Sequence, residues 1–331
     1  MSSVVAGRHV HVRLLEDFED PGLRAAKWDR LVARSPDVVF MTFAWQREWW
    51  RALSSERERL LLVLAERDGE VCAVAPLFAA KEMLMLVGSD GSDYLDFIGE
   101  LDELTLAAML DCARRELPDF AGIGLYHVPR RSRTTALLPA VAERLGLGLY
   151  SEGEQTAPYA DLADPERVRH LVARRGVRKA ESRLRRGGPL TTRCAGEGEL
   201  DEWLKLFFAQ HASVWSQEEG FRRADVRAFC RAIVHVGHRE GWLRFAMLES
   251  QDHAAAFEIT LLRGARHLSY VGSRDVALDR YSPGAVLQAH NVQAAVAEGA
   301  RRWDFGLGAE TYKLRDASGL AEVANWFMYP A

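Results

Sequence analysis

The sequence predicts an α/β protein built from two similar halves. One order of elements, strand–turn–strand–strand–loop–helix–strand, occurs twice, at an offset of about 184 residues. Of the 331 residues, 48% are hydrophobic and 27% are charged, which is the composition of folded domains with apolar cores. The length fits two domains of about 150 residues each.

The first half begins with a predicted hairpin. Asp68-Gly69 separates two apolar runs, Arg59–Arg67 and Val71–Phe78, and this pair is typical of a two-residue turn between strands. A third strand, a loop, a helix and a further strand follow at Met83–Gly88, Ser89–Gly99, Asp102–Leu117 and Ile123–His127.

The second half repeats this order. Gln251-Asp252 occupies the turn between predicted strands at Trp242–Glu249 and Ala254–Leu262. The third strand, loop, helix and last strand follow at His267–Gly272, Ser273–Gly284, Ala285–Glu298 and Arg302–Gly306. Both third strands end in Val-Gly, and these matching ends and spacings favour an internal duplication.

Helical material joins the halves, and we place the domains at 1–158 and 159–331. Asp164-Pro165 is a favourable helix start, and Gly187-Gly188-Pro189 ends the segment 164–186. Amphipathic helices are predicted to follow, the first of them closed by His211, which we expect to be a core histidine. In the first half, three tryptophans that we expect to serve packing share one helix face: Trp45, Trp49 and Trp50.

Charge is unevenly distributed along the chain. The formal net charge of −4 excludes a globally basic nucleic-acid binder, yet Glu166–Arg186 holds nine Arg or Lys against two Glu. This segment is a solvated helix face, a pairing partner for acidic surface, or a contact for a tRNA, an acyl carrier protein or an anionic lipid surface. The residues predicted for a polyanion contact are Arg174, Arg175, Arg178, Arg185 and Arg186.

Several classes of protein are excluded by what the sequence lacks. It has no apolar run long enough to span a membrane, and Met1–Arg13 does not have the pattern of a signal peptide. The four cysteines are scattered without a C-x-x-C pair, and the histidines form no recognisable ligand pattern. We therefore expect a cytoplasmic protein with no metal and no permanently bound cofactor.

The loop before the second-half helix is a candidate anion site. Tyr281, Ser282, Pro283 and Gly284 lead from a strand into a helix, where backbone N–H groups and the helix dipole favour a phosphate. Pro283 suits the first helical position, and Gly284 allows close backbone approach. A plain helix start explains the same residues.

The order and spacing of several short motifs resemble one enzyme family. The C-terminal motifs run from Tyr281–Gly284 through Trp303–Gly308 to Glu310–Lys313. The upstream motifs are Phe43–Trp45 with Trp49-Trp50, Ala75–Phe78, Gly88 with Asp93–Asp96, the Arg-rich helix, and His211 with Trp215. Together they resemble the GNAT-superfamily acyltransferases of the CelD-like (cellulose-biosynthesis) family, which are related to the Fem-type aminoacyltransferases.

The resemblance implies the fold and which half binds which substrate. It implies tandem GNAT-like domains, each a mixed, mostly antiparallel sheet flanked by helices. The usual R/Q-x-x-G-x-G/A pyrophosphate loop is reduced here to Arg280–Gly284, with one glycine. The first half has the acidic loop Ser89–Gly99 instead, which would repel a pyrophosphate. We therefore expect the donor in the second half, the acceptor side in the first, and the acceptor between the halves.

The resemblance also suggests site residues. Asp304, in the last predicted strand, is a candidate base or acceptor-orienting carboxylate, a solvent-facing strand residue, or a partner for an arginine. Lys313 would face a donor phosphate or developing negative charge, and Tyr312 would protonate the leaving group. The acceptor would contact Asp93, Tyr94, Asp96 and Glu258, although loop chemistry or an exposed strand face also explains these residues.

We expect an N-acyltransferase that moves an acyl group from a thioester to an amine. The donor would be acyl-CoA or an acyl carrier protein, and the acceptor a small-molecule, saccharide or peptide amine. One alternative is aminoacyl transfer from a charged tRNA, which the basic segment favours. The other is a catalytically inactive binding module, which the reduced phosphate loop favours.

Overall fold

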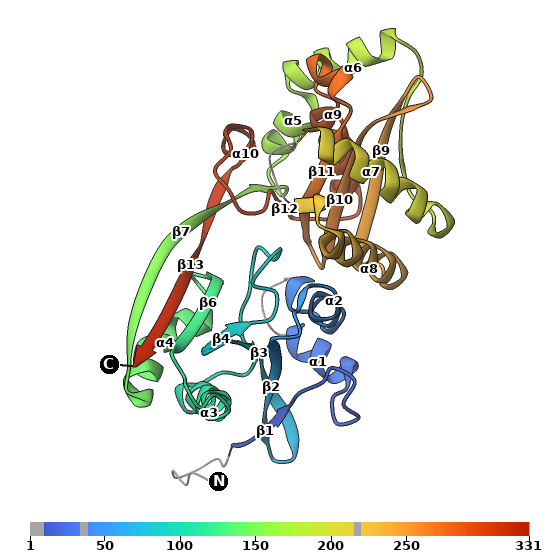
Figure 1. Ribbon diagram of the computed structural model, residues 1–331. Helices are drawn as coiled ribbons and strands as arrows, with labels where there is room; N and C mark the ends of the chain where they lie inside the picture. The colour runs from blue at the N-terminus through green and yellow to red at the C-terminus, as the bar shows by residue number, and fades with distance from the viewer. Residues whose placement is uncertain (1–9, 34–38, 215–219, 331) are drawn as a thin grey trace. The chain divides into compact units, whose positions relative to one another are not determined.

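The structure, a computed structural model, describes residues 10–33, 39–214 and 220–330, so Trp215 lies outside the described residues. The chain forms two units (Figure 1). Unit 1 comprises Met1–Thr156 and Ala321–Ala331, and unit 2 comprises Ala157–Leu320. We expected one boundary, between residues 158 and 159. The units differ from that expectation mainly because the last residues of the chain, Ala321–Ala331, return to unit 1.

Unit 1 is a mixed sheet between helices. Its strands follow the spatial order β1 (His11–Leu15), β2 (Glu58–Arg67), β3 (Glu70–Ala80), β4 (Met83–Leu86), β6 (Gly122–Pro129) and β13 (Gly319–Pro330). The short β5 (Ile98–Gly99) pairs with β3. Only β4 and β6 pair in parallel among these described strands. The helices are α1 (Ala25–Val32), α2 (Phe43–Leu53), α3 (Glu103–Arg114) and α4 (Arg133–Leu145).

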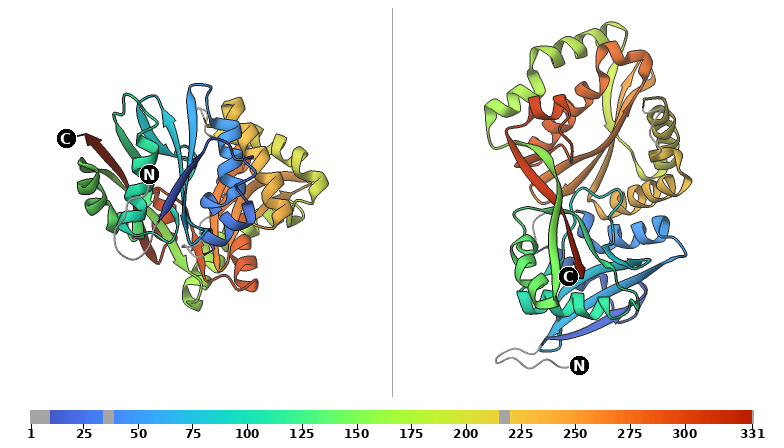
Figure 2. Two further views of the ribbon diagram at one scale, coloured as in Figure 1. Left: turned by 90° about the horizontal axis from the view of Figure 1, so that it is seen from below. Right: turned by 60° about the vertical axis from the view of Figure 1, so that its left-hand side comes forward.

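Unit 2 repeats this plan. The end of β7 (Leu147–Asp161) pairs with β12 (Arg302–Asp304), and β11 (Arg266–Arg274), β10 (His253–Arg263), β9 (Leu243–Ser250) and β8 (Leu190–Cys194) follow in order. The pair β11–β12 is parallel, like β4–β6. The chain passes between the units through the neighbouring strands β7 and β13 (Figures 1 and 2). The predicted fold class and duplicated order of elements are confirmed.

Both predicted hairpins have the turn that their residues favour. Asp68 and Gly69 have φ of 53° and 79°, and Gln251 and Asp252 have φ of 55° and 62°. Two successive left-handed residues make the turn whose twist matches that of the paired strands. Asp and Gly accept this backbone readily, and the glutamine is the less usual choice.

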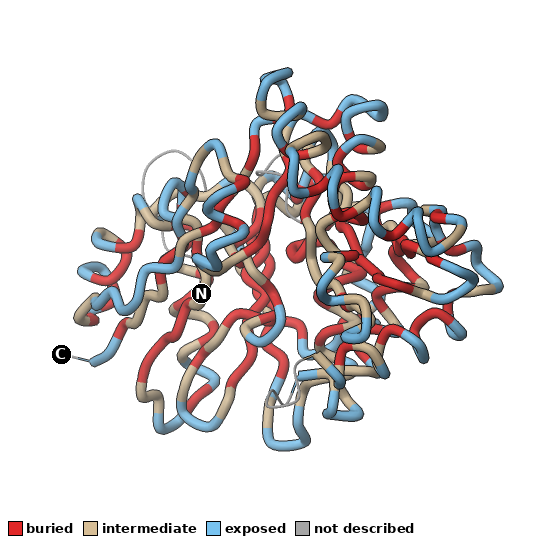
Figure 3. The backbone as a smooth tube through the Cα atoms, turned by 90° about the horizontal axis from the view of Figure 1, so that it is seen from above, coloured by how far each residue is buried: buried red, intermediate tan, exposed pale blue. Residues whose placement is uncertain are grey.

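Helices cover both faces of the unit 2 sheet. The Trp203 ring of α7 (Leu200–Val214) lies 5.6 Å from the ring of Phe245 on β9, and α8 (Ala224–Glu240) packs beside α7. On the opposite face, Val286 of α9 (Pro283–Ala297) joins a buried cluster with Ala246 and Leu248 of β9. Residues of β9 therefore alternate between two covered faces, and buried stretches concentrate in the strands (Figure 3).

Helix α2 fixes the acidic loop of unit 1. Thr42 caps the helix by accepting a hydrogen bond from the Trp45 amide. The Trp45 indole donates to Ser92 Oγ at 3.0 Å, and the Trp49 indole donates to the Asp90 carbonyl. The predicted packing role of these tryptophans therefore includes holding the loop 89–99.

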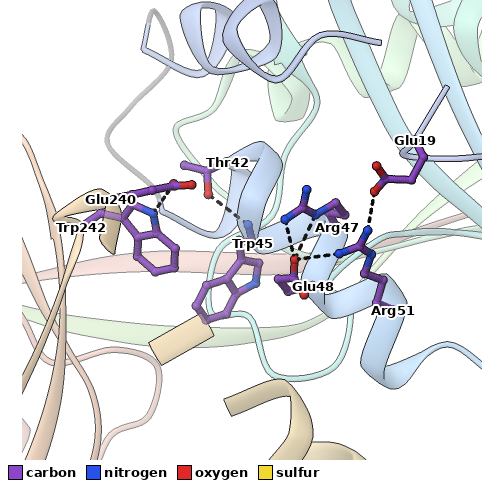
Figure 4. A network of polar contacts seen from close by, with 8 residues as sticks. All are labelled: Glu19, Thr42, Trp45, Arg47, Glu48, Arg51, Glu240 and Trp242. Atoms are coloured by element: carbon purple, nitrogen blue, oxygen red, sulfur yellow. Dashed lines mark hydrogen bonds and ion pairs between the residues drawn. The ribbon is translucent and has the colours of Figure 1, made fainter. Parts of the chain in front are cut away.

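The outer side of α2 carries ion pairs instead of apolar contacts. Arg47 and Arg51 both reach Glu48, at 2.7 and 3.4 Å, and Arg51 also pairs with Glu19 (Figure 4). These partly exposed pairs contribute little stability each, so the helix is held mainly by its tryptophan face.

Gly99 lies so close to the backbone of Cys72 that a larger residue would clash there. A Cβ on Gly99, which has φ of 97°, would lie 2.2 Å from the Cys72 carbonyl oxygen. We expect Gly99→Ala to lower the free energy of unfolding by roughly 2–4 kcal/mol, since strain and a backbone clash combine. Gly69→Ala, with φ of 79° and nothing within 4 Å, should cost only about 1 kcal/mol. Urea unfolding measures both, and equal losses would contradict the close approach.

Within residues 10–33, 39–214 and 220–330, no helix is long and apolar enough to cross a membrane. Nor does that part of the chain bring together three His, Cys, Asp or Glu side chains in a way that could hold a metal ion.

Candidate active site

The sheet of unit 2 splits between β11 and β12. The two strands pair only where Arg266–Leu268 lies beside Arg302–Asp304. Strand β12 ends at Asp304, whereas β11 continues to Arg274, so from Ser269 onward β11 runs without β12 beside it. Tyr270 is an extra residue in β11, because Thr260 pairs with Ser269 while Ile259 pairs with Val271. Such bulges are common next to active sites.

A pocket of about 550 Å³ opens at this split, and unit 2 alone supplies its lining. Its walls come from β10, the part of β11 beyond β12, the start of α9 and the short helix α10 (Thr311–Asp316). The lining includes most of the polar groups discussed below: Glu258, Ser269, Ser282, Gly284, Tyr312, Lys313, Arg174 and His211.

Glu258 is a buried carboxylate in this pocket. It lies on β10, on the face covered by α9, and it is 6% exposed. Its oxygens accept hydrogen bonds from Ser269 Oγ and from the Asn291 side-chain amide of α9. Both partners are neutral, and burial raises the pKa of this carboxyl. The exposed strand face that the sequence allowed is therefore excluded, and the carboxylate is placed to accept a proton or hold a cation.

Helix α10 presents Tyr312 and Lys313 to the same pocket. Tyr312 is 46% exposed overall, but desolvation of its hydroxyl, together with the Glu310 and Glu258 carboxylates, raises its pKa to about 12. The phenol therefore stays protonated at neutral pH and can donate a proton. The Lys313 ammonium is almost fully buried, donates to the Leu307 carbonyl and pairs with Glu310 Oε2 at 3.1 Å.

The predicted anion loop also borders the pocket. Ser282 has a left-handed backbone with φ of 49°, and α9 begins at Pro283, so Ser282 and Gly284 line the pocket at the helix N-terminus. Pro283 is buried, and Tyr281 packs on the core cluster beneath α9. Two of the four predicted donor residues thus face the pocket, and the other two support them.

The structure does not bring Asp304 into the pocket lining. Its side chain is fully buried and accepts hydrogen bonds from Arg266, from Arg302 at 3.3 Å and from the Gly306 amide at 2.9 Å. Two guanidinium groups balance this carboxylate inside the sheet. Burial excludes the solvent-facing residue that the sequence allowed, and this geometry fits the arginine partner.

The predicted acceptor residues of the first half belong to unit 1. Tyr94 is 3% exposed, and its ring lies 6.0 Å from that of Phe40. Asp96 accepts hydrogen bonds from Thr134 Oγ1 and the Phe97 amide, and burial raises its pKa to about 6. Asp93 is half-buried in the same loop. The pocket in unit 2 gathers Glu258 but none of these three.

The basic segment forms two helices, α5 (Pro165–Ala173) and α6 (Arg175–Arg186). Arg174, between them, is half-buried and donates to Asp316 at 3.0 Å, and burial lowers its pKa. Arg185 pairs with Glu181 at 2.7 Å. The other three predicted contact residues are exposed: Arg175, Arg178 and Arg186.

Sequence reasoning missed two residues that fix Glu258. Ser269 follows the point where β12 stops pairing with β11, and Asn291 lies on the buried side of α9. A polar amide at the helical spacing of Leu287 and Ala295 was the available signal, because a buried amide requires a partner. No comparable signal marks Ser269.

The histidine that closes the α7 stripe gives a pH test. Burial lowers the pKa of His211 to about 4, below its ordinary 6.5, so the folded state disfavours the charged ring. The unfolded chain therefore binds more protons between those values, and stability falls as pH drops from 6.5 towards 4. We expect wild type to lose about 2 kcal/mol more than His211→Asn between pH 7 and pH 5 in urea unfolding. Equal losses in the two proteins would contradict this environment.

Comparisons with known proteins relate unit 2 to a known domain family and the whole chain to known folds. Residues 172–314, which hold almost the whole pocket, match the model of the acetyltransferase (GNAT) domain. The FemX structure is 14% identical with a TM-score of 0.67, covering 96% of this chain and 97% of that one. A search of curated proteins found no match.

Two further structures have similar folds. The C-terminal domain of a putative lysylphosphatidylglycerol synthetase from Agrobacterium fabrum is 13% identical, with a TM-score of 0.60, covering 92% of this chain and 90% of that one. A tandem GNAT protein from the clavulanic acid biosynthesis pathway is 14% identical, with a TM-score of 0.53, covering 97% and 99%. The chain thus has the fold of tandem GNAT proteins and Fem-type transferases. Its second unit carries an acetyltransferase (GNAT) domain, and this domain indicates that the protein is an acyltransferase.

Proposed function

We propose that the protein transfers an acyl group from a thioester to an amine in the pocket of unit 2. The observation that carries this proposal is the meeting of two side chains at the sheet split: Glu258, a buried carboxylate that forms no ion pair within the described residues, and Tyr312, a protonated phenol. A proton acceptor and a proton donor on one pocket are what acyl transfer to an amine requires.

The donor is assigned to the α9 side of the pocket. The start of α9 offers the Gly284 N–H and the positive end of the helix dipole beside Ser282, whereas the Ala285 and Val286 amides donate to the Ser282 carbonyl. These groups suit the phosphates of a coenzyme A or phosphopantetheine thioester. The part of β11 beyond β12, which is paired on its other edge with β10, then runs along the pocket, where backbone groups on its open edge can hold the thioester carbonyl.

The chemical step divides between two side chains. The amine nitrogen attacks the thioester carbonyl carbon, the C–N bond forms, and the C–S bond breaks. The Glu258 carboxylate takes the proton that the amine loses, and the Tyr312 hydroxyl gives a proton to the departing thiolate. Lys313 lies on the same wall and stabilises negative charge that develops on the carbonyl oxygen. A catalytic role for Asp304 remains a prediction, and a structural role is the alternative.

A donor-by-acceptor screen tests this function. Full-length protein is incubated with acetyl-CoA and longer acyl-CoAs, each with pooled amino acids, amino sugars and short peptides, and mass spectrometry detects acylated products. The proposal expects an N-acylated product with release of a free thiol. Donor binding without any product across acceptors would support the binding module instead.

Tyr312→Phe tests whether the Tyr312 hydroxyl protonates the leaving thiolate. Loss of the hydroxyl should lower kcat about 10- to 100-fold while KM for the donor changes little, because only leaving-group protonation is removed. The effect should shrink with an aryl thioester donor, whose thiolate leaves without a proton. Tyr329→Phe, on exposed β13 of unit 1, is the matched control. An unchanged kcat would remove Tyr312 from the step.

Aminoacyl transfer from a charged tRNA is the second candidate. The similarity in fold to FemX and the exposed arginines of α6 favour it. Incubation with aminoacyl-tRNA and the same amines tests it directly. Transfer from tRNA with none from thioesters would replace the first candidate.

A further inference from the structure

Helix α6 has two opposite faces. Val177, Ala180 and Leu184 are buried, at the spacing of one helix side. Five exposed cationic residues cover the other side at i, i+3, i+4, i+8 and i+11, and we call them the α6 basic face: Arg175, Arg178, Lys179, Arg183 and Arg186. Within the described residues, none of these five side chains forms an ion pair. Their charge is therefore available to a partner.

The apolar side of α6 packs directly on the proposed donor loop. Ala180 and Leu184 share a core cluster with Val286 and Leu287 of α9, and Leu278 and Tyr281 of the preceding loop pack against it. At the other end, Arg174, the residue before α6, lines the pocket. The basic face and the donor side of the pocket are thus built on one packed unit of structure.

We propose that the α6 basic face docks an acidic helix of an acyl carrier protein, which delivers the acyl thioester on its phosphopantetheine arm to the adjacent pocket. This inference rests on the proposed thioester-dependent function and names the carrier of its donor. The arm follows the anion-favouring start of α9 into the pocket, and the carrier protein stays on the surface.

The shape of the face favours a helical protein partner. Its cations form a single stripe along a helix of 12 residues, about 18 Å long, which can lie alongside one acidic helix. Recognition of an unpaired RNA end relies on stacking of bases on aromatic side chains. The α6 sequence, RGVRKAESRLRR, contains no aromatic residue. Charge complementarity without stacking suits an acidic protein better than the single-stranded end of a tRNA.

Fluorescence anisotropy with full-length protein tests the docking. The probe is the fluorescently labelled acyl carrier protein of fatty-acid synthesis from the source organism, loaded with an octanoyl group. We expect Arg178→Glu, Lys179→Glu and Arg186→Glu together to raise Kd about tenfold or more at low salt. The matched control reverses three exposed arginines elsewhere and should change Kd little: Arg24→Glu, Arg131→Glu and Arg239→Glu.

A second readout separates this inference from the proposed function. Calorimetric titration with octanoyl-CoA measures the pocket alone, and its Kd should be similar in wild type and in the α6 triple variant. Octanoyl-CoA binding with no carrier binding, or equal loss in both triple variants, would overturn the docking and leave the proposed function standing. Failure of both ligands to bind would overturn the function itself. Binding of tRNA in preference to the carrier, lost in the α6 variant, would assign the face to RNA.

Discussion

Replacing Glu258 with glutamine is expected to lower kcat for acyl transfer about 10²- to 10⁴-fold, because the amide cannot take the proton of the amine. The substitution keeps the size of the side chain and can still hydrogen-bond with Ser269 and Asn291. The donor KM should change little, since the donor is assigned to the α9 side. Stopped-flow or steady-state kinetics with the best donor and acceptor pair measure the effect.

Stability gives an independent check on the same variant. The folded pKa of Glu258 is raised by burial, so between its ordinary value and the raised one the folded state binds more protons than the unfolded chain. Stability linked to this group is therefore present at low pH and is lost as pH rises through the raised pKa. Glu258→Gln removes that loss, and at neutral pH it should be as stable as wild type or more stable.

An exposed glutamate of unit 2 provides the matched control for Glu258→Gln. Glu298→Gln, which removes the charge of an exposed partner of Arg244, should leave kcat within about twofold of wild type. If Glu258→Gln retained full kcat, the carboxylate would have no role as the base. If it unfolded the protein, the buried network would be structural first.

Asp304→Asn is expected to give the largest loss of stability. The substitution removes the buried charge that the partly exposed guanidinium groups of Arg266 and Arg302 share; these side chains are 15% and 30% exposed. Breaking a fully buried ion pair from one side costs about 3–5 kcal/mol, and the partial exposure of the arginines places the expected loss near the lower end of that range. Urea unfolding should show a lower midpoint with an unchanged slope.

Kinetics of the same variant decide between the two roles of Asp304. Under conditions where the variant is folded, kcat should stay within about tenfold of wild type if the residue is structural. Asp201→Asn, which breaks an exposed pair with Arg231 of 2.9 Å, should leave the free energy of unfolding close to that of wild type. A stable Asp304→Asn protein with kcat lowered a thousandfold would restore Asp304 to the chemistry.

The sequence predicts the fold well because its signals are local. The turns at Asp68-Gly69 and Gln251-Asp252, the alternation along β9 and β10, and the Pro283 helix start each lie within a few residues. The duplication then sets the order of strands in each unit. The return of the last strand to unit 1 was not predictable in this way, because it depends on pairing with β6, far away in the sequence.

The site is predicted only in part, because burial and partner choice are not local. The pattern around Trp303 predicts that Asp304 points away from its aromatic neighbours, but it cannot show that Arg266 and Arg302 meet that carboxylate. The sequence allows Glu258 to be either a cleft residue or an exposed one. Only the covering helix α9, through Asn291, shows that it is buried.

A crystal structure with a non-transferable thioether analogue of octanoyl-CoA tests the central claim most directly. The account predicts that the analogue occupies the pocket of unit 2, with phosphate groups at the start of α9 beside Ser282 and Gly284. The thioether sulfur should lie at the split between β11 and β12, within hydrogen-bonding reach of Tyr312. Binding at saturating analogue with the phosphates away from α9, or with the sulfur outside this pocket, would contradict it.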